Sequence, residues 1–336
     1  MRVRGVVGAG LFRAIQAALL PLAAAAYLMG VPKLLLYSRR TGVSATQFAS
    51  LYTRYMQHNL GTRRDDPVAR LMAVMPNVSQ EALRLGAAPT LVAHLLTGFV
   101  PRFYRYPYEG EPPMRHQQTA RTSFHDAALR RHLPGIEQLV VLGAGFDTRV
   151  FRLPPEEGVR CFEVDMPRTQ AFKIRMLKES GLTGGPATYV AADFGNEDWF
   201  GQLVAAGYDP ARPTFFLWES VMMYLDRASV EGTLRRIAGA APGSVVAFDY
   251  FSADTIASRS LFMRYARATT RLVGEPFTFG IDNTPPARES VAEFLGDFGL
   301  VLEEHRMFGT ERISRTGSRQ RCAPAGFATA LVGRST

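Results

Sequence analysis

The spacing of hydrophobic and polar positions changes near residue 137. From there on, short apolar runs alternate with stretches of helical periodicity; the runs are QLVVLGAG, VRCFEVD, ATYVAAD, TFFLWES and SVVAFDYF. This alternation is typical of a parallel sheet covered by helices. Two further runs, LVLEEHRMF and GFATALVGR, have no helical stretch between them. They predict an antiparallel pair, and the whole pattern predicts an α/β fold with a seven-stranded, mostly parallel sheet.

The chain before the first strand is mainly helical in pattern. Residues 44–130 contain apolar positions at helical spacing, and the helix-like stretch RTSFHDAALRRHL runs into the first strand. The aromatic and proline-rich stretch RFYRYPYEGEPPMRHQQ interrupts them and is expected to be irregular. A helical N-terminal region therefore precedes the sheet.

Residues 14–30, AIQAALLPLAAAAYLMG, form a nearly continuous apolar run. Basic residues flank it on both sides: Arg2, Arg4 and Arg13 before it, and Lys33, Arg39 and Arg40 after it. A membrane-spanning helix needs roughly 20 apolar residues, whereas this run is shorter and contains Gln16 and Pro21. We expect a helix that packs on the protein or touches a membrane peripherally through residues 11–37. Insertion or export is the alternative interpretation.

Composition limits the possible classes of protein. The 336 residues are 47% hydrophobic and 21% charged, which is ordinary for a globular protein. Cys161 and Cys322 are the two cysteines, and so few suit a reducing cytosol. The net charge of +9 comes almost wholly from scattered arginines. Since these form no basic stripe with interleaved aromatic residues, we expect no nucleic-acid partner. The low number of cysteines predicts a cytoplasmic location, with membrane association as the alternative.

The first predicted strand ends in a glycine turn. In LVVLGAGFDTRVFRL, residues 139–153, Gly143, Ala144 and Gly145 let the backbone approach a ligand. The next residues are predicted to begin a helix, whose N-terminus favours negative charge. Thr148 stands where a dinucleotide-binding motif has its third glycine. Asp147 is interpreted either as the cap of that helix or as a ligand contact.

Acidic residues follow the next strands at positions that suit an adenosine-like ligand. Asp165, about twenty residues after the glycines, is placed to accept hydrogen bonds from ribose hydroxyls, and Glu163 points to the same side of the strand. Asp193 with Phe194 suits an adenine, and Glu219 suits an ammonium. Each acid also has a structural interpretation. The acid at the end of the second strand is then a purely structural carboxylate, Asp193 is a helix cap before NEDWFGQL, and Glu219 is a solvated charge at a strand end.

The segments LGAGFDTRVFRL, EVDMP, AADF and WESVMMYL, in this order and spacing, resemble the leucine carboxyl methyltransferase-like family. That family contains many actinobacterial O-methyltransferases that depend on S-adenosyl-L-methionine (SAM), and enzymes that act on polyketides. The resemblance covers roughly residues 115–336. It implies a class I (Rossmann-like) methyltransferase core, SAM as the cofactor, and a pairing of Arg121 with the carboxylate of its methionine part.

The resemblance also implies a division of the chain. Residues 1–125 are expected to form a helical substrate lid and residues 126–336 the SAM-binding core, with a lid insertion at about 252–290. The apolar first 40 residues have no counterpart in the family, which leaves the methyl acceptor open.

The resulting hypothesis is an O-methyltransferase for a small, hydrophobic carboxylic acid or phenol/polyketide. A carboxylate acceptor needs no general base; a hydroxyl needs one, and the candidates before the first strand are His116, His125, Tyr104 and Tyr106, none of which is assigned. No metal site is expected, because no residues have ligand spacing. The alternatives are an NAD-linked oxidoreductase, disfavoured by the missing glycine, and a non-catalytic methyltransferase fold that binds a membrane or a partner.

Overall fold

The computed structural model describes residues 2–43, 47–182, 185–195, 198–309, 311 and 322–333. Seven strands form one sheet in the order β3-β2-β1-β4-β5-β7-β6. The strands are β1 (Gln138–Leu142), β2 (Arg160–Asp165), β3 (Ala187–Ala191), β4 (Thr214–Trp218), β5 (Val245–Phe251), β6 (Leu300–Phe308) and β7 (Ala325–Val332).

The first five strands are parallel, and β7 lies antiparallel between β5 and β6. The predicted class I methyltransferase fold is therefore confirmed. A dinucleotide-binding sheet has six parallel strands in the order 3-2-1-4-5-6. The antiparallel β7 therefore distinguishes this fold from the dinucleotide-binding fold. The strand order reverses between β1 and β4, and ligands of α/β sheets bind at the carboxyl ends of the strands beside such a reversal.

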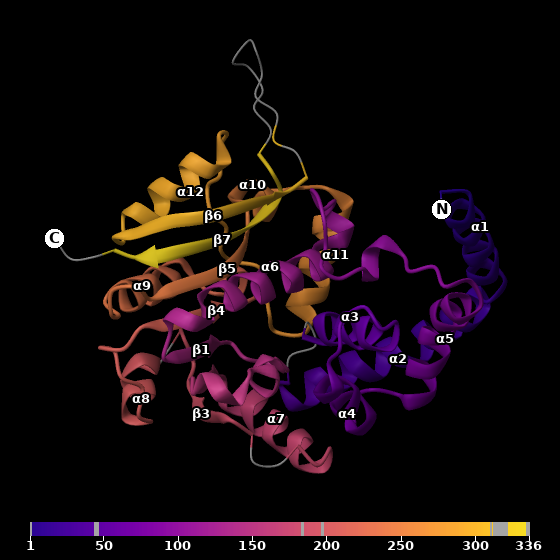
Figure 1. Cartoon of the computed structure of the whole chain (residues 1–336), viewed down its shortest axis with the longest axis horizontal. Helices are drawn as coiled ribbons and strands as arrows, with labels where there is room; N and C mark the ends of the chain where they lie inside the picture. Colours follow the sequence, from indigo (N-terminus) through magenta and orange to yellow (C-terminus); the bar gives the residue numbers. More distant parts are fainter. Residues whose placement is uncertain are drawn as a thin grey trace, which may run out of the picture.

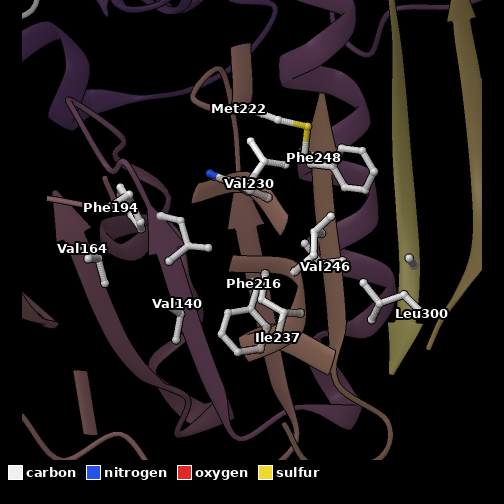
Figure 2. Close-up of a cluster of buried hydrophobic side chains, with 14 of the residues drawn as sticks. Val140, Val164, Phe194, Phe216, Met222, Val230, Ile237, Val246, Phe248 and Leu300 are labelled. Carbon is white, nitrogen blue, oxygen red and sulfur yellow. The ribbon is translucent and has the colours of Figure 1, made fainter. Parts of the chain in front are cut away.

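Helices cover both faces of the sheet. On one face, Val140 and Leu142 of β1 join a core with residues of α8 (Trp199–Ala205), α9 (Arg227–Ala238) and α12 (Ala287–Gly296). Figure 2 shows part of this core, with side chains of β1, β2, β4 and β5 and with Val230 and Ile237 of α9. On the other face, Leu139 and Val141 pack with α6 (Gln117–His132), and α7 (Pro167–Glu179) lies beside β2 and β3. Successive residues of a strand point to opposite faces, which accounts for this division.

The predicted helix after the glycine turn is not present. Residues 143–159 contain two 3-10 turns, Arg149–Arg152 and Pro155–Glu157. Pro154 and Pro155 restrict any helix in this segment to the residues before them, because neither has a backbone N–H to donate within a helix. The residue before a proline is also disfavoured in the helical region. The expected contribution of a helix N-terminus to ligand binding is therefore wrong for this turn.

The N-terminal region is helical, as predicted. Its helices are α1 (Arg2–Ala18), α2 (Leu20–Thr41), α3 (Gln47–Asn59), α4 (Asp66–Val74) and α5 (Gln80–Thr97). The apolar run 14–30, expected to form one helix, is divided between α1 and α2, because Pro21 begins a new helix. Residues 102–116 contain two short 3-10 turns, which confirms their irregular character.

The helical region contacts the sheet domain through α3 and α4. Leu51 of α3 and Leu71 of α4 share a core with Phe172 and Met176 of α7. Helices α1, α2 and α5 pack on one another and lie together at one end of the molecule (Figure 1). Between β5 and α12, the chain forms α10 (Ala253–Ala257) and α11 (Leu261–Leu272).

Candidate active site

A cavity of about 530 Å³ lies at the carboxyl ends of the parallel strands. The sheet contributes the residues that follow its strands: Gly143, Ala144, Gly145 and Asp147 after β1, Asp165 and Met166 at the end of β2, Asp193 and Phe194 after β3, and Glu219 with Ser220 after β4. Helix α3, helix α6 and the segment after α11 form the other walls. Small-molecule sites have volumes of about 300–1,000 Å³, so this cavity has a suitable size.

In the turn after β1, positions 143 and 145 need glycine, both for the backbone conformation and because a side chain would have no room there. Gly143 has φ +65° and Gly145 has φ +44°, both in the left-handed region. A Cβ atom on Gly143 would lie 2.2 Å from Cγ2 of Val221, which follows β4. The turns after β1 and β4 therefore touch at the point where the strand order reverses.

Asp165 is bound to the glycine turn. Its Oδ2 accepts a hydrogen bond from the backbone N–H of Gly145 at 2.5 Å, and its Oδ1 accepts one from the N–H of Met166 at 2.7 Å. Burial raises the pKa of Asp165 to about 6, against the opposing effect of these two hydrogen bonds. The carboxylate lines the cavity with its position fixed from two sides.

Glu219 is held by two arginines. Its Oε1 accepts from Nε of Arg121 at 3.0 Å, and its Oε2 accepts from Nη1 of Arg149 at 2.6 Å. Burial acts to raise the pKa of Glu219, but Arg149 and Arg121 outweigh it and hold the pKa well below its usual range. Glu219 is thus neither solvated nor unpaired, and it stays ionised at the cavity wall.

Arg121 lines the cavity as expected from the resemblance, but it already has protein partners. Its Nη2 donates to Oγ of Ser50 and to Oε1 of Gln118, both at 2.6 Å, and its Nη1 lies 3.5 Å from Oδ2 of Asp249. Through these bonds α6 is joined to α3 and to β5. A ligand carboxylate at Arg121 would add to this set or displace part of it.

Sequence reasoning missed two buried arginines. Arg149 donates from Nε to Oδ1 of Asp126 at 2.6 Å, and it also pairs with Asp147. Arg54 of α3 lines the cavity and donates to the carbonyl oxygen of Phe146 at 2.9 Å. Arg149 belongs to the segment GFDTR, which was a signal for it. Asp147, which lines the cavity, accepts from the backbone N–H of Arg149 and caps no α-helix.

Glu163 is the predicted site residue that the structure places elsewhere. It is absent from the cavity wall formed by the described residues, and its side chain is 1% exposed. Its Oε2 lies 2.5 Å from Nζ of Lys173, which also donates to the carbonyl oxygen of Asp147 at 2.9 Å. The interpretation as a buried structural carboxylate fits Glu163.

Asp193 and Phe194 line the cavity beyond β3. The Oδ1 atom of Asp193 accepts from the backbone N–H of Gly195 at 2.9 Å. The helix-cap alternative for Asp193 is wrong, because Asp198 caps α8. Phe194 packs on Trp199, with 5.5 Å between ring centroids, and so presents a fixed ring to the cavity.

The four general-base candidates lie away from the wall that the described residues form. The hydroxyl of Tyr106 donates to Oδ2 of Asp126 at 2.9 Å. The Nδ1 atom of His116 lies 2.8 Å from the hydroxyl of Tyr108, and His125 is buried 3.8 Å from Asp249. Tyr104 is also in the protein interior, where burial raises its pKa. Among the described residues, no group of three or more His, Cys, Asp or Glu side chains could hold a metal ion.

Residues 97–238 match the family model described as leucine carboxyl methyltransferase. The resemblance predicted from the motifs is therefore confirmed for this part of the chain. It contains all ten predicted cofactor-contacting residues, from Arg121 to Glu219.

Individual relatives also match part of the chain. A protein of Mycobacterium sp. (strain KMS), named "Putative S-adenosyl-L-methionine-dependent methyltransferase", is 36% identical over 48% of this chain and 53% of its own length. A protein of Mycobacterium ulcerans with the same name is 32% identical over 60% of this chain and 64% of its own length. The matches thus span about half to two thirds of these relatives. A crystal structure of a duf574 family protein from Streptomyces avermitilis has a TM-score of 0.45 at 17% identity, over 65% of this chain and 84% of that chain.

Proposed function

Since residues 97–238 match the leucine carboxyl methyltransferase family, we propose that the chain is a SAM-dependent O-methyltransferase. One observation carries the proposal: a single cavity brings together the glycine turn, the ribose-type acid Asp165 and the charged pair Arg121–Glu219. A ligand with an adenosine at one end and an amino acid at the other needs these groups in one place.

The residues present fit SAM by their donor and acceptor chemistry. Asp165 would accept from the ribose hydroxyls, because its carboxylate is fixed by the N–H groups of Gly145 and Met166. Asp193 and Phe194 would hold the adenine. Arg121 would meet the ligand's carboxylate and Glu219 its ammonium. Bound SAM supplies a methyl group on a sulfonium, which is already activated for transfer.

The rest of the cavity favours a hydrophobic acceptor. Its apolar wall comes from the turn after β4, the end of β5 and the segment after α11: Val221, Met223, Leu225, Phe251, Pro276 and Phe277. Such a wall binds hydrocarbon and aromatic surface and excludes water. We therefore propose a small carboxylic acid or a phenol/polyketide as the substrate.

The chain's contribution to the transfer is mainly alignment. Holding two reactants in the geometry for displacement removes much of the entropic part of the barrier. A carboxylate acceptor is ionised at neutral pH and requires no proton acceptor from the protein. The position of His116, His125, Tyr104 and Tyr106 away from the cavity favours such an acceptor over a hydroxyl.

The test uses the full chain with methyl-labelled SAM and a panel of fatty acids, aromatic acids and phenols. We expect label on a carboxyl oxygen of a hydrophobic acid, loss of transfer in Asp165→Ala, and unchanged transfer in Glu179→Gln, an exposed acid of α7. Calorimetry with SAM and with NADH accompanies it. Binding of NADH in place of SAM would support an oxidoreductase, and SAM binding without transfer to any acceptor would support a non-catalytic role.

A further inference from the structure

The large hydrophobic side chains that remain exposed are concentrated on four helices. They are Val7 and Leu11 of α1, Leu20, Leu22, Tyr27, Leu28, Met29 and Leu36 of α2, Val92, Leu95 and Leu96 of α5, and Leu261, Tyr265 and Leu272 of α11. We call this set the apolar face. The other exposed large hydrophobic residues of the described chain are Met166, Ile174, Val204 and Val301, which are scattered. Apolar surface gathered in this way usually marks an interaction site.

Helix α2 has one covered side and one open side. Gly30 and Gly86 allow α2 and α5 to pack closely, since added Cβ atoms would lie 3.3 Å from Ala82 and Ala26 respectively. Helix α2 is long and apolar enough to cross a membrane, yet only 6% of its most apolar stretch is buried. Much of the side that faces away from α5 is therefore apolar and exposed.

Helix α11 has its apolar stripe on the outside. Leu261, Tyr265 and Leu272 recur at spacings of four and seven, which places them on one side of a helix, and all three are exposed. Met263 and Thr270 are its buried positions. A hydrogen bond between the side chains of Tyr27 and Tyr265 raises the pKa of Tyr265, so α11 lies beside α2. The apolar side chains of α2 and α11 are thus neighbours.

Basic residues predominate around the apolar face, and Glu81 in the first turn of α5 is the one acidic residue on its four helices. Residues 1–64 contain no Asp or Glu, and neither do residues 256–274, which include all of α11. Exposed basic residues lie on the same helices: Arg13, Lys33, Arg39, Arg40, Arg264 and Arg271. Apolar side chains whose charged neighbours are mainly basic are typical of helices that lie on an anionic membrane surface.

We propose that the apolar face docks on the surface of an anionic phospholipid bilayer, with its helices lying in the interface. The packing of α2 on α5 favours this arrangement over a spanning α2, because a spanning helix would lose that packing. The charge argues against a second copy of the chain, since pairing would bring the same basic residues against each other. The proposal does not depend on methyl transfer.

The position of α11 links the membrane to the cavity. Residues directly after α11, Gly274 to Phe277, line the cavity. If the proposed function holds, a lipophilic acceptor could pass from the bilayer to the cavity beside this helix. Membrane binding and methyl transfer are measured separately, so failure of one leaves the other standing.

The experiment measures sedimentation of the full chain with vesicles. One preparation is pure phosphatidylcholine, and the other mixes phosphatidylcholine with phosphatidylglycerol. We expect preferential binding to the mixed vesicles, weakened by salt. The double variant Leu28→Glu/Leu261→Glu should lose about tenfold or more in vesicle affinity. The matched control is Val301→Glu, which changes an exposed valine of β6 outside the apolar face and should bind like the parent protein.

Three results would overturn the proposal. The folded parent protein fails to sediment with either vesicle; the double variant and the control bind equally; or light scattering shows a dimer of the parent protein that the double variant converts to a monomer. Circular dichroism of each variant establishes that it is folded. Arg39→Glu/Arg40→Glu provides a second, independent variant, expected to weaken binding to the mixed vesicles alone.

Discussion

The carboxylate of Asp165 and the backbone N–H of Gly145 are joined by a hydrogen bond of 2.5 Å. This bond connects the carboxyl end of β2 to the glycine turn after β1. The acid proposed to bind ribose is therefore fixed by the same turn that lets a ligand approach the sheet. Its position is set before any ligand arrives, which reduces the entropic cost of binding.

The raised pKa of Asp165 predicts a pH dependence of SAM binding. Burial raises this pKa to about 6, so the carboxylate becomes protonated as the pH falls through 6. In the proposed site the ionised form would accept from two ribose hydroxyls, whereas the protonated form would accept less well. Calorimetry between pH 5 and 8 should show SAM affinity falling below pH 6. Asp165→Asn should bind at least about tenfold more weakly at pH 7.5 and lose this pH dependence. An unchanged profile in the variant would contradict the assignment.

The same group has the opposite effect on stability. Its folded pKa lies above the ordinary value of 3.8, so the folded chain binds more protons than the unfolded chain between these two values. The contribution of Asp165 to the free energy of unfolding therefore decreases as the pH rises from about 4 to 6. Added SAM should offset this loss, and thermal melts with and without SAM at pH 5 and 7 would measure it.

Glu219→Gln tests the charged wall of the cavity. Arg149 and Arg121 hold the pKa of Glu219 well below its usual range, so its stabilisation is present above the unfolded value of 4.5 and is lost as the pH falls. Removing one charge from a buried pair costs about 3–5 kcal/mol. We expect the lower part of this range at pH 7, because Arg149 retains Asp126 and Asp147. Urea unfolding of the variant should approach the parent below pH 4; a constant difference would exclude an electrostatic cause.

The ion pair of Lys173 and Glu163 predicts a rescue. Burial raises the pKa of Glu163 to about 7, against the opposing effect of Lys173. In Lys173→Met this carboxyl must stay buried without its partner or take up a proton, and either should lower the free energy of unfolding by about 3–5 kcal/mol. In the variant Lys173→Met/Glu163→Gln no ionisable group is left at the position, so most of this loss should be recovered. Denaturant unfolding of the parent, the single variant and the double variant forms the measurement. A double variant as unstable as the single one would show that packing, and not charge, dominates at this position.

The sheet and the strand-end residues could be predicted because each is a local signal. A short apolar run predicts a strand, and parallel strands bring their carboxyl ends to one edge of the sheet. Asp165, Asp193 and Glu219, which lie at or just after these ends, are therefore predicted to lie together. Hydrogen bonds between residues far apart in the sequence leave no such local pattern. Arg54 meets Phe146 across 92 positions of chain, and Arg149 meets Glu219 across 70. Pro154 and Pro155 indicate where a helix after Gly145 would have to end, but the sequence gives no local signal that the helix is absent.

Gly143 and Gly158 have nearly the same backbone conformation but different surroundings. Replacing each by alanine therefore distinguishes the cost of backbone strain from the cost of steric overlap. Gly143 has φ +65° and Gly158 has φ +63°, but a Cβ on Gly143 would lie 2.2 Å from Val221, whereas a Cβ on Gly158 meets nothing within 4 Å. Gly158→Ala should therefore cost only the strain of the left-handed region, about 1–2 kcal/mol of the free energy of unfolding. Gly143→Ala carries the same strain and must also displace Val221 from the cavity wall. We expect it to unfold at lower denaturant concentration than Gly158→Ala and to bind SAM more weakly, while Gly158→Ala binds SAM like the parent. Equal stability and equal affinity of the two variants would mean that the turns after β1 and β4 can separate at no cost, contrary to the close contact seen between them.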